Sequence, residues 1–227
     1  MILMFVLYYI DYKKHKKTTK FRPNLSVIIP FYNLGEHIEE TLLSALESDF
    51  EDKEIIIIND GTTQIGCLQT LEKIRKNYPE IIVIDIPNGG LANARNVGAY
   101  HARGKYITFL DADDLVESTF FSQSVAILDK WSNISFVYSW LQYFEGGNGI
   151  WPTFNTDLPY IGCANMLSAF CIVRRDDFME CGLNNPEMIY GMEDFESWLR
   201  MVSNGNIGFA IPQALVRYRV RANSMSR

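Results

Sequence analysis

Four short runs of apolar residues recur along the first half of the chain. They lie at residues 25–30, 54–58, 81–86 and 106–110, and most of their positions are Ile, Val, Leu or Phe. A strand with one face in water alternates apolar and polar residues, whereas these runs alternate very little. The pattern therefore predicts strands that are buried on both faces, as in a parallel sheet.

Helical stretches separate these runs. We expect helices at roughly 35–48, 64–77 and 91–102, so that one strand and one helix recur in every segment of about thirty residues. Strands and helices that alternate in this way are typical of an α/β fold with a doubly wound, mostly parallel sheet.

The second half of the chain has a mixed pattern. A helix is predicted at 117–130 and a strand at 135–144, but after these only 193–202 has a clear helical pattern. We therefore divide the folded part of the chain into a sheet half at 23–115 and a mixed half at 116–227.

Charge is distributed unevenly along the 227 residues. The net charge is −6, but six of the 21 Lys and Arg residues and only one of the 27 acidic residues lie in segment 11–22. The remaining 15 basic and 26 acidic residues give the rest of the chain a net charge of −11. Such an acidic body repels a phosphate backbone, which argues against a nucleic-acid binder. It also implies that a phosphate ligand is held through a cation.

The first 22 residues form an apolar and basic tail. Residues 1–10 are almost wholly apolar, but a helix that spans a bilayer needs about 20 such residues. A signal peptide carries its positive charges before the apolar stretch, whereas here they follow it. Three interpretations stay open: the stump of a longer anchor, a segment at the membrane surface with its lysines against anionic lipid, and a terminus with no membrane contact.

Cysteine and histidine spacing indicates neither a disulfide framework nor a zinc site. The four cysteines form no C-x-x-C pair, and the three histidines form no H-E-x-x-H motif. A chain of this length can build its core without disulfides, so we expect free thiols.

Polar residues follow each of the four apolar runs. They are Tyr32 and Asn33 after the first, Asn59–Thr62 after the second, Asn88–Gly90 after the third and Asp111–Asp114 after the fourth. The carboxyl ends of parallel strands meet at one edge of a sheet, and ligands of open α/β folds bind there. We therefore expect the functional site at this edge.

Asp111 and Asp113 form a D-x-D pattern in a chain that lacks both G-x-G-x-x-G after the first strand and G-x-x-x-x-G-K-[ST]. A diphosphate would therefore need neutralisation by something other than a glycine-rich loop. The two carboxylates could hold Mg²⁺ or Mn²⁺, which prefer oxygen ligands and leave positions for substrate phosphates. The structural alternative is a turn, with Asp113 or Asp114 capping the helix near residue 117.

Five motifs together resemble the family 2 inverting glycosyltransferases. The motifs are Ser26–Asn33 (SVIIPFYN), Ile58–Thr62 (INDGT), Gly89–Gly98 (GGLANARNVG), Tyr106–Asp114 (YITFLDADD) and Gly191–Trp198 (GMEDFESW). Their order and spacing match over about residues 25–226. The resemblance implies a glycosyltransferase-A fold. The first half of the chain would bind a nucleotide-sugar donor, for which a UDP-sugar is the leading candidate, and the second half would bind an acceptor.

The resemblance also implies roles for residues after the first three strands. Pro30 and Tyr32 would line the base and ribose, and Asp60 would accept a hydrogen bond from uracil N3–H. Arg95 would contact the base or the diphosphate. Without the resemblance, Tyr32 could be a packing residue, Asp60 a turn residue and Arg95 a surface cation.

The same resemblance assigns the acid loop and the end of the chain. Asp111 would bind the ribose or the sugar, and Asp113 would coordinate the divalent metal, Mn²⁺ or Mg²⁺. Two residues depart from the family pattern, because Asn59 stands where an aspartate is common and Arg221 where a histidine metal ligand is common. Arginine cannot ligate a cation but can clamp a diphosphate, so we expect Arg221 to bind the nucleotide-sugar.

Glu193 and Asp194 resemble the acidic pair of the family at the start of a helix. The resemblance implies that Asp194 is the general base for the acceptor hydroxyl and that Glu193 orients the acceptor or the base. The alternative is that both acids lie there because the helix dipole favours them. We expect Trp198, one turn later, to be a core aromatic rather than a residue that stacks on an acceptor sugar.

The resemblance therefore implies a metal-dependent, inverting glycosyltransferase that acts on a glycan or lipid-linked acceptor in the cytoplasm, at the inner face of the membrane if the tail binds there. The Q-x-x-R-W signature of processive relatives is absent, so we expect one transfer per encounter. Two alternatives stay open. One is a module that binds a nucleotide-sugar without turnover, and the other is a nucleotidyltransferase, which would need a glycine-rich basic loop after the first strand.

Overall fold

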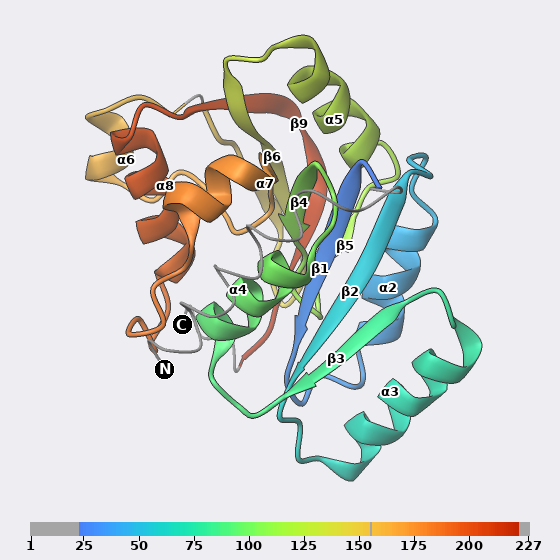
Figure 1. Cartoon of the computed structure of the whole chain (residues 1–227). Coiled ribbons are helices and arrows are strands. Elements are labelled where there is room, and N and C mark those ends of the chain that lie inside the picture. The colour runs from blue at the N-terminus through green and yellow to red at the C-terminus, as the bar shows by residue number, and fades with distance from the viewer. Residues whose placement is uncertain (1–22, 155, 223–227) are drawn as a thin grey trace.

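One mixed sheet of nine strands runs through residues 23–154 and 156–222, the part of the chain that the computed structural model describes (Figure 1). The strand order is β3-β2-β1-β4-β8-β6-β9-β5, and β7 pairs with β6. The strands are β1 (Leu25–Phe31), β2 (Lys53–Asp60), β3 (Ile82–Ile86), β4 (Tyr106–Phe109), β5 (Leu115–Val116), β6 (Ile134–Glu145), β7 (Gly149–Trp151), β8 (Cys171–Arg174) and β9 (Ile207–Val220). The helical elements are α2 (Ile38–Leu46), α3 (Ile65–Asn77), α4 (Leu91–His101), α5 (Phe120–Lys130), α6 (Tyr160–Cys163), α7 (Arg175–Asp177), the π-helical turn η1 (Phe178–Gly182) and α8 (Glu193–Ser203).

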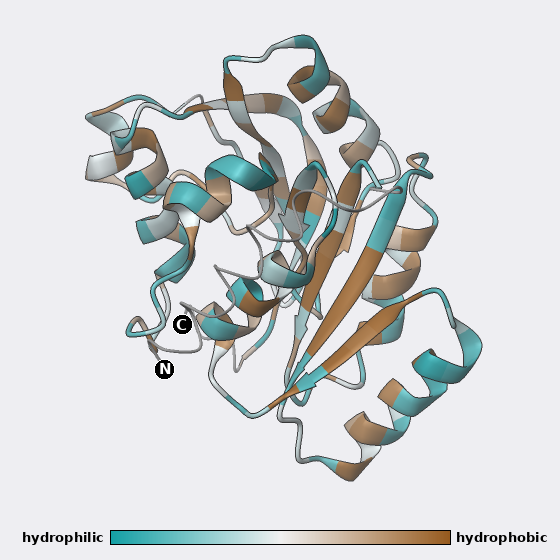
Figure 2. Ribbon diagram, in the orientation of Figure 1, coloured by the Kyte–Doolittle hydropathy of each residue, from teal (hydrophilic) through white to brown (hydrophobic). Residues whose placement is uncertain are grey.

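The four predicted apolar runs form the parallel half of this sheet. β1 lies between β2 and β4, β3 lies outside β2, and all of these pairs are parallel. Ile29 packs in a core with α2, α3 and α5, whereas its neighbour Ile28 packs in a second core with α4, η1 and α8. Figure 2 shows β2 as hydrophobic along its centre and hydrophilic at its ends. β1, β2 and β4 are therefore buried on both faces, as predicted, whereas β3, at the edge of the sheet, is only partly buried, and the prediction is wrong for it.

The second half adds strands that the sequence pattern did not reveal. β8 is antiparallel to β4 and β6, while β9 runs parallel to β6 and antiparallel to β5. The prediction of only one clear element after residue 150 therefore missed β9, the longest strand. Its pairing with β6 jumps from Ile211 to Ala214, which leaves Pro212 in a bulge. A proline inside a strand weakens the strand pattern, and a bulge is where a sheet tolerates it.

Helix positions agree well with the sequence pattern for three of the five predicted helices. The predicted helices at 64–77, 91–102 and 193–202 match α3, α4 and α8 to within one residue, whereas α2 and α5 begin three residues later than expected. α4 lies especially close to the sheet. A Cβ at its Gly98 would lie 2.2 Å from Ile28 Cγ2, so the glycine permits this approach.

Residues 1–22, the N-terminal tail for which the sequence left a membrane contact open, lie outside the described residues. Every helix that the structure does describe is too short or too polar to cross a bilayer.

Candidate active site

The segments that follow the parallel strands are joined to one another at the carboxyl edge of the sheet. Asn33, after β1, accepts hydrogen bonds through Oδ1 from the backbone N–H groups of Thr63 and Gln64, at 3.1 Å each. Asn33 adopts a φ of 53° in this turn, a conformation that asparagine tolerates better than most residues. The predicted gathering of the strand ends at one edge is confirmed for this pair, and it holds Tyr32 at the edge with 46% of its surface exposed.

Asp60 connects the end of β2 to the loop after β3. Its two carboxylate oxygens accept hydrogen bonds from the backbone N–H groups of Gly89, at 2.8 Å, and Gly90, at 2.9 Å. Burial raises the pKa of Asp60, and the two N–H groups offset part of that rise. The alternative that Asp60 supports a turn is therefore confirmed. A carboxylate has about four lone-pair positions, so the predicted bond from a nucleobase would add to these bonds rather than replace them.

Asn59, the first departure from the family pattern, lies in a network of its own. Its Oδ1 accepts a hydrogen bond from the Thr62 backbone N–H at 3.1 Å, and its Nδ2 donates to Asp85 Oδ1 at 2.9 Å. Asp85 also accepts from Arg75 at 2.7 Å. An aspartate at position 59 would offer Asp85 no donor, so the amide fits this particular environment. Pro30, which the sequence assigned to the base site, is buried within β1.

Asp111–Asp114, which we call the acid loop, follows β4 and is held by the end of β9. Asp114 is buried and accepts a hydrogen bond from the Arg219 backbone N–H at 2.6 Å, while Arg219 Nε donates to the Asp113 carbonyl at 2.7 Å. Arg221 Nε donates to Asp113 Oδ2 at 2.5 Å. α5 begins at Phe120 with no side-chain cap, so the alternative that Asp113 or Asp114 caps this helix is wrong.

The acid loop concentrates negative charge in a poorly hydrated place. Burial raises the pKa of Asp113, and the neighbouring Asp111 raises it further, whereas Arg221 and His37 lower it. Burial and both neighbouring carboxylates hold the pKa of Asp114 well above its ordinary value. Carboxylates this close to one another favour a bound cation, because each one disfavours ionisation of the others.

Arg95 bridges the acid loop and the start of α8. It is only 2% exposed, and its guanidinium donates to Glu193 Oε1 at 2.6 Å and to Asp111 Oδ1 at 2.8 Å. The alternative that Arg95 is a surface cation is therefore wrong. The sequence indicated no partner for Arg95, because Glu193 lies 98 residues away in the chain. Nη1 and Nη2 of Arg95 thus each bind a different carboxylate.

Glu193 and Asp194 begin α8 next to this bridge. Glu193 is buried against Arg95, while Asp194 is partly buried. Burial raises the pKa of Asp194, Arg95 lowers it, and Glu193 raises it again. Trp198 is 1% exposed and stacks on Phe136 with ring centroids 5.4 Å apart. Its assignment to the core is therefore confirmed.

The protein oxygens of the acid loop fit a divalent cation only in part. Among the described residues, no group of three or more His, Cys, Asp and Glu side chains is arranged to hold a metal ion. Mg²⁺ and Mn²⁺ are, however, commonly held by one or two carboxylates together with substrate phosphates. Asp113 and Asp111 supply such a set, which a diphosphate would complete.

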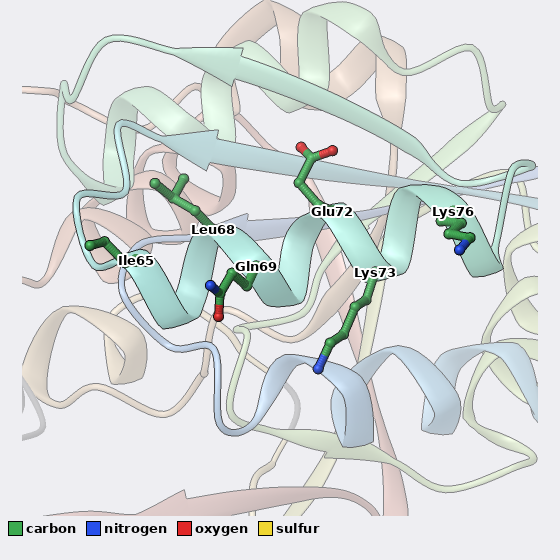
Figure 3. Close-up of a pocket in the computed structure, with 6 residues that line it drawn as sticks. All are labelled: Ile65, Leu68, Gln69, Glu72, Lys73 and Lys76. Atoms are coloured by element: carbon green, nitrogen blue, oxygen red, sulfur yellow. The ribbon is translucent and has the colours of Figure 1, made fainter.

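A hollow of about 470 Å³ lies elsewhere, on the outer face of α3 (Figure 3). The residues that line it are Ile65, Leu68, Gln69, Glu72, Lys73 and Lys76. It contains none of the predicted site residues, and its one carboxylate, Glu72, is paired with Arg75 at 2.7 Å. We therefore assign the candidate site to the acid loop and its surroundings.

A family model and a curated relative both match most of this chain. The family model described as "Glycosyl transferase family 2" matches residues 26–182. An uncharacterized glycosyltransferase of Haemophilus influenzae is 31% identical over 227 residues, which cover 90% of this chain and 68% of the relative.

Solved structures share the fold. The chain resembles S. aureus TarS in complex with UDP-GlcNAc, with a TM-score of 0.77 and 24% identity over 89% of this chain and 60% of TarS. It also resembles the mannosyltransferase PcManGT of Pyrobaculum calidifontis in complex with GDP-Man and Mn²⁺, with a TM-score of 0.68 and 18% identity over 97% of this chain and 66% of that one.

Proposed function

The chain belongs to glycosyl transferase family 2, and we propose that it transfers a sugar from a UDP-sugar to a hydroxyl group of a glycan or lipid-linked acceptor. Its fold is of the glycosyltransferase-A type. We further propose that the transfer is non-processive, depends on a divalent cation and inverts the anomeric carbon, with Asp194 as the general base.

The observation that supports this proposal most is the bridge from Asp111 through Arg95 to Glu193. It places the acid loop, which would hold the diphosphate, beside the acid pair, which would receive the acceptor. Single displacement needs both groups at one reacting carbon, the leaving diphosphate on one face and the base on the other.

Donor binding would use the residues at the edge of the parallel strands. Tyr32 presents an exposed ring for the base, and Asp60 presents a carboxylate with capacity left for one more hydrogen bond. Asp113, with Asp111, would hold Mn²⁺ or Mg²⁺, which would neutralise the diphosphate and its departing charge. Arg221, now on Asp113, would contact the same phosphates as a second cation.

Acceptor activation would rest on Asp194. Its raised pKa makes it a stronger base than an exposed aspartate. Glu193 is committed to Arg95 in this structure, so we assign it to holding the base side of the site together rather than to proton transfer.

The proposal is tested by incubating the purified protein with UDP-sugars and MnCl₂ and measuring the release of UDP. Release of UDP, first by hydrolysis and then faster with an acceptor mixture, is expected. Binding of UDP-sugars with no release under any condition would instead support a binding module without turnover.

Asp60→Ala is expected to weaken UDP binding by about 1–3 kcal/mol, the range for losing a hydrogen bond to a charged group. The loss should be larger for UDP than for CDP or ADP, because only uracil offers the N3–H donor. Calorimetric titration of the three nucleotides measures this difference. Asn88→Ala is the control for the loop, since Asn88 Nδ2 donates to the Asp60 carbonyl at 2.8 Å and to Asp60 Oδ2 at 3.3 Å, so its loss weakens the turn while the carboxylate stays in place. An equal loss for all three nucleotides would show that Asp60 only supports the loop.

A further inference from the structure

Asn96, the residue after Arg95 on α4, is joined to a distant loop by two hydrogen bonds. Its side chain is almost fully buried, at 1% exposure. Its Nδ2 donates to the Asn184 carbonyl at 2.7 Å, and its Oδ1 accepts from the Asn184 backbone N–H at 2.9 Å. Because a carbonyl only accepts and an N–H only donates, these partners fix the orientation of the amide.

Asn184 in turn forms a hydrogen bond with the first residue of α8. Its side-chain Nδ2 donates to the backbone carbonyl of Glu193 at 3.2 Å. Arg95 meanwhile holds the carboxylate of the same glutamate at 2.6 Å. Two adjacent residues of α4 therefore hold Glu193, the first residue of α8. Arg95 binds its side chain, and Asn96 is linked through Asn184 to its backbone carbonyl.

The start of α8 has no side-chain cap, although Ser197 and Trp198 anchor the helix further along through hydrogen bonds to Gly182 and Ser168. The residue before it, Met192, has a φ of 68° and makes no side-chain capping bond, and Gly191 has a φ of 104°. A left-handed conformation at a non-glycine residue is strained and persists only where the surroundings impose it. The connection from Asn96 is a source of that constraint, since it ends one peptide unit away.

We propose that Asn96 is a positioning residue that sets the location of Asp194, a role that rests on the proposed function. Asp194 directly follows the residue that Asn96 and Arg95 fix, so a change in either connection moves the base relative to the acceptor hydroxyl. A general base must lie within hydrogen-bond reach of the proton that it takes, and a misplacement of about 1 Å can lower the rate by roughly 100-fold.

Asn96→Asp tests this role with almost no change in volume. The aspartate presents an oxygen to the Asn184 carbonyl in place of the Nδ2 donor, so the first link of the connection breaks. The turnover number for sugar transfer should fall by roughly 10- to 100-fold. The affinity for UDP, measured by calorimetry, should stay within about twofold, because Asn96 has no place in the proposed donor site.

Asn206→Asp is the matched control for lost stability. Asn206 Nδ2 donates to the Met201 carbonyl at 3.1 Å, so the same substitution breaks a side-chain bond to α8 at its opposite end. Because Asn206 is less buried than Asn96, we expect a smaller drop in melting temperature, with a turnover number near that of the wild type. Equal turnover in the two variants would overturn the proposal.

Asn184→Ala keeps the test available should Asn96→Asp fail to fold. It removes only the second link, the bond to the Glu193 carbonyl, and should also lower turnover without weakening UDP binding. Where both variants fold, the double variant should lose no more than Asn96→Asp alone, because both changes break one connection. Full turnover in Asn184→Ala would contradict the inference. Absence of transfer in the wild type would instead refute the proposed function.

Discussion

Replacing Asp194 by Asn is expected to lower the rate of sugar transfer by roughly 10²–10⁴-fold, the usual contribution of a general base. Asparagine keeps the shape of the side chain but cannot take a proton near neutral pH. Donor affinity should remain nearly unchanged, because in the proposed mechanism Asp194 contacts the acceptor and not the diphosphate. Steady-state transfer rates and a separate UDP titration measure the two effects.

Glu196→Gln is the control on the same helix. Glu196 pairs with Arg200 at 3.0 Å near the surface, so its loss changes the charge of α8 without touching the bridge. Such exposed pairs contribute little to stability, and turnover should be near normal. The competing view, that Asp194 only favours the helix N-terminus, predicts a loss of about 1 kcal/mol in stability and near-normal turnover. Wild-type turnover in Asp194→Asn would remove the assignment of the base.

The pH dependence of sugar transfer by the wild type should reflect the ionisation of Asp194. A base must be ionised to act, and burial raises the pKa of Asp194 above the ordinary value of 3.8. Activity should therefore be lost as the pH falls through this raised pKa, so the acidic limb of kcat/KM lies above 3.8. The residual activity of Asp194→Asn should lack that limb.

Asp113→Ala is expected to abolish the dependence of UDP binding on a divalent cation. The site is acidic, so a diphosphate can enter it only with its charge neutralised. Without the Asp113 carboxylate, Mn²⁺ would no longer bridge the protein and the diphosphate. Calorimetric titration of UDP with MnCl₂ and with EDTA should show a large difference for the wild type and almost none for the variant.

Asp129→Ala controls for the loss of one negative charge. Asp129 pairs with Lys105 on the surface, away from the acid loop, so its removal should leave the metal dependence intact. A wild-type affinity for UDP that is the same with MnCl₂ and EDTA would refute the metal assignment. Arg221 would then be the leading candidate for the counter-charge of the diphosphate, since it already lies on the acid loop.

The sequence predicted the parallel half of the fold because there local pattern and burial agree. Strands such as β2 contain unbroken apolar runs, and each is followed by a clear helix and a polar turn. The acid loop could be located for the same reason, since Asp111 must follow the end of β4. Both predictions depend on neighbours in the chain.

The remaining features depend on contacts between distant residues. The bridge through Arg95 joins residues 98 positions apart, and Asn96 meets Asn184 across 88 positions. β9 was missed because Pro212 interrupts its pattern, although the alternation of arginine with Tyr218 and Val220 is a signal of a half-buried strand that could have been used. Burial of a charged residue is the hardest feature to read from sequence, since it is decided by partners that pattern does not show.

The position of β9 has a consequence for how the protein is made. β9 is the last described strand in the chain, yet it lies inside the sheet, between β6 and β5. Ribosomes deliver the chain from its N-terminus, and domains begin to fold in that order. Until β9 emerges, β6 has an unpaired edge open to pairing with other chains. The acid loop also lacks Arg219, whose backbone N–H and guanidinium hold it. A nascent chain that stalls before β9 would thus lack both the strand that covers the edge of β6 and the arginine that holds the acid loop.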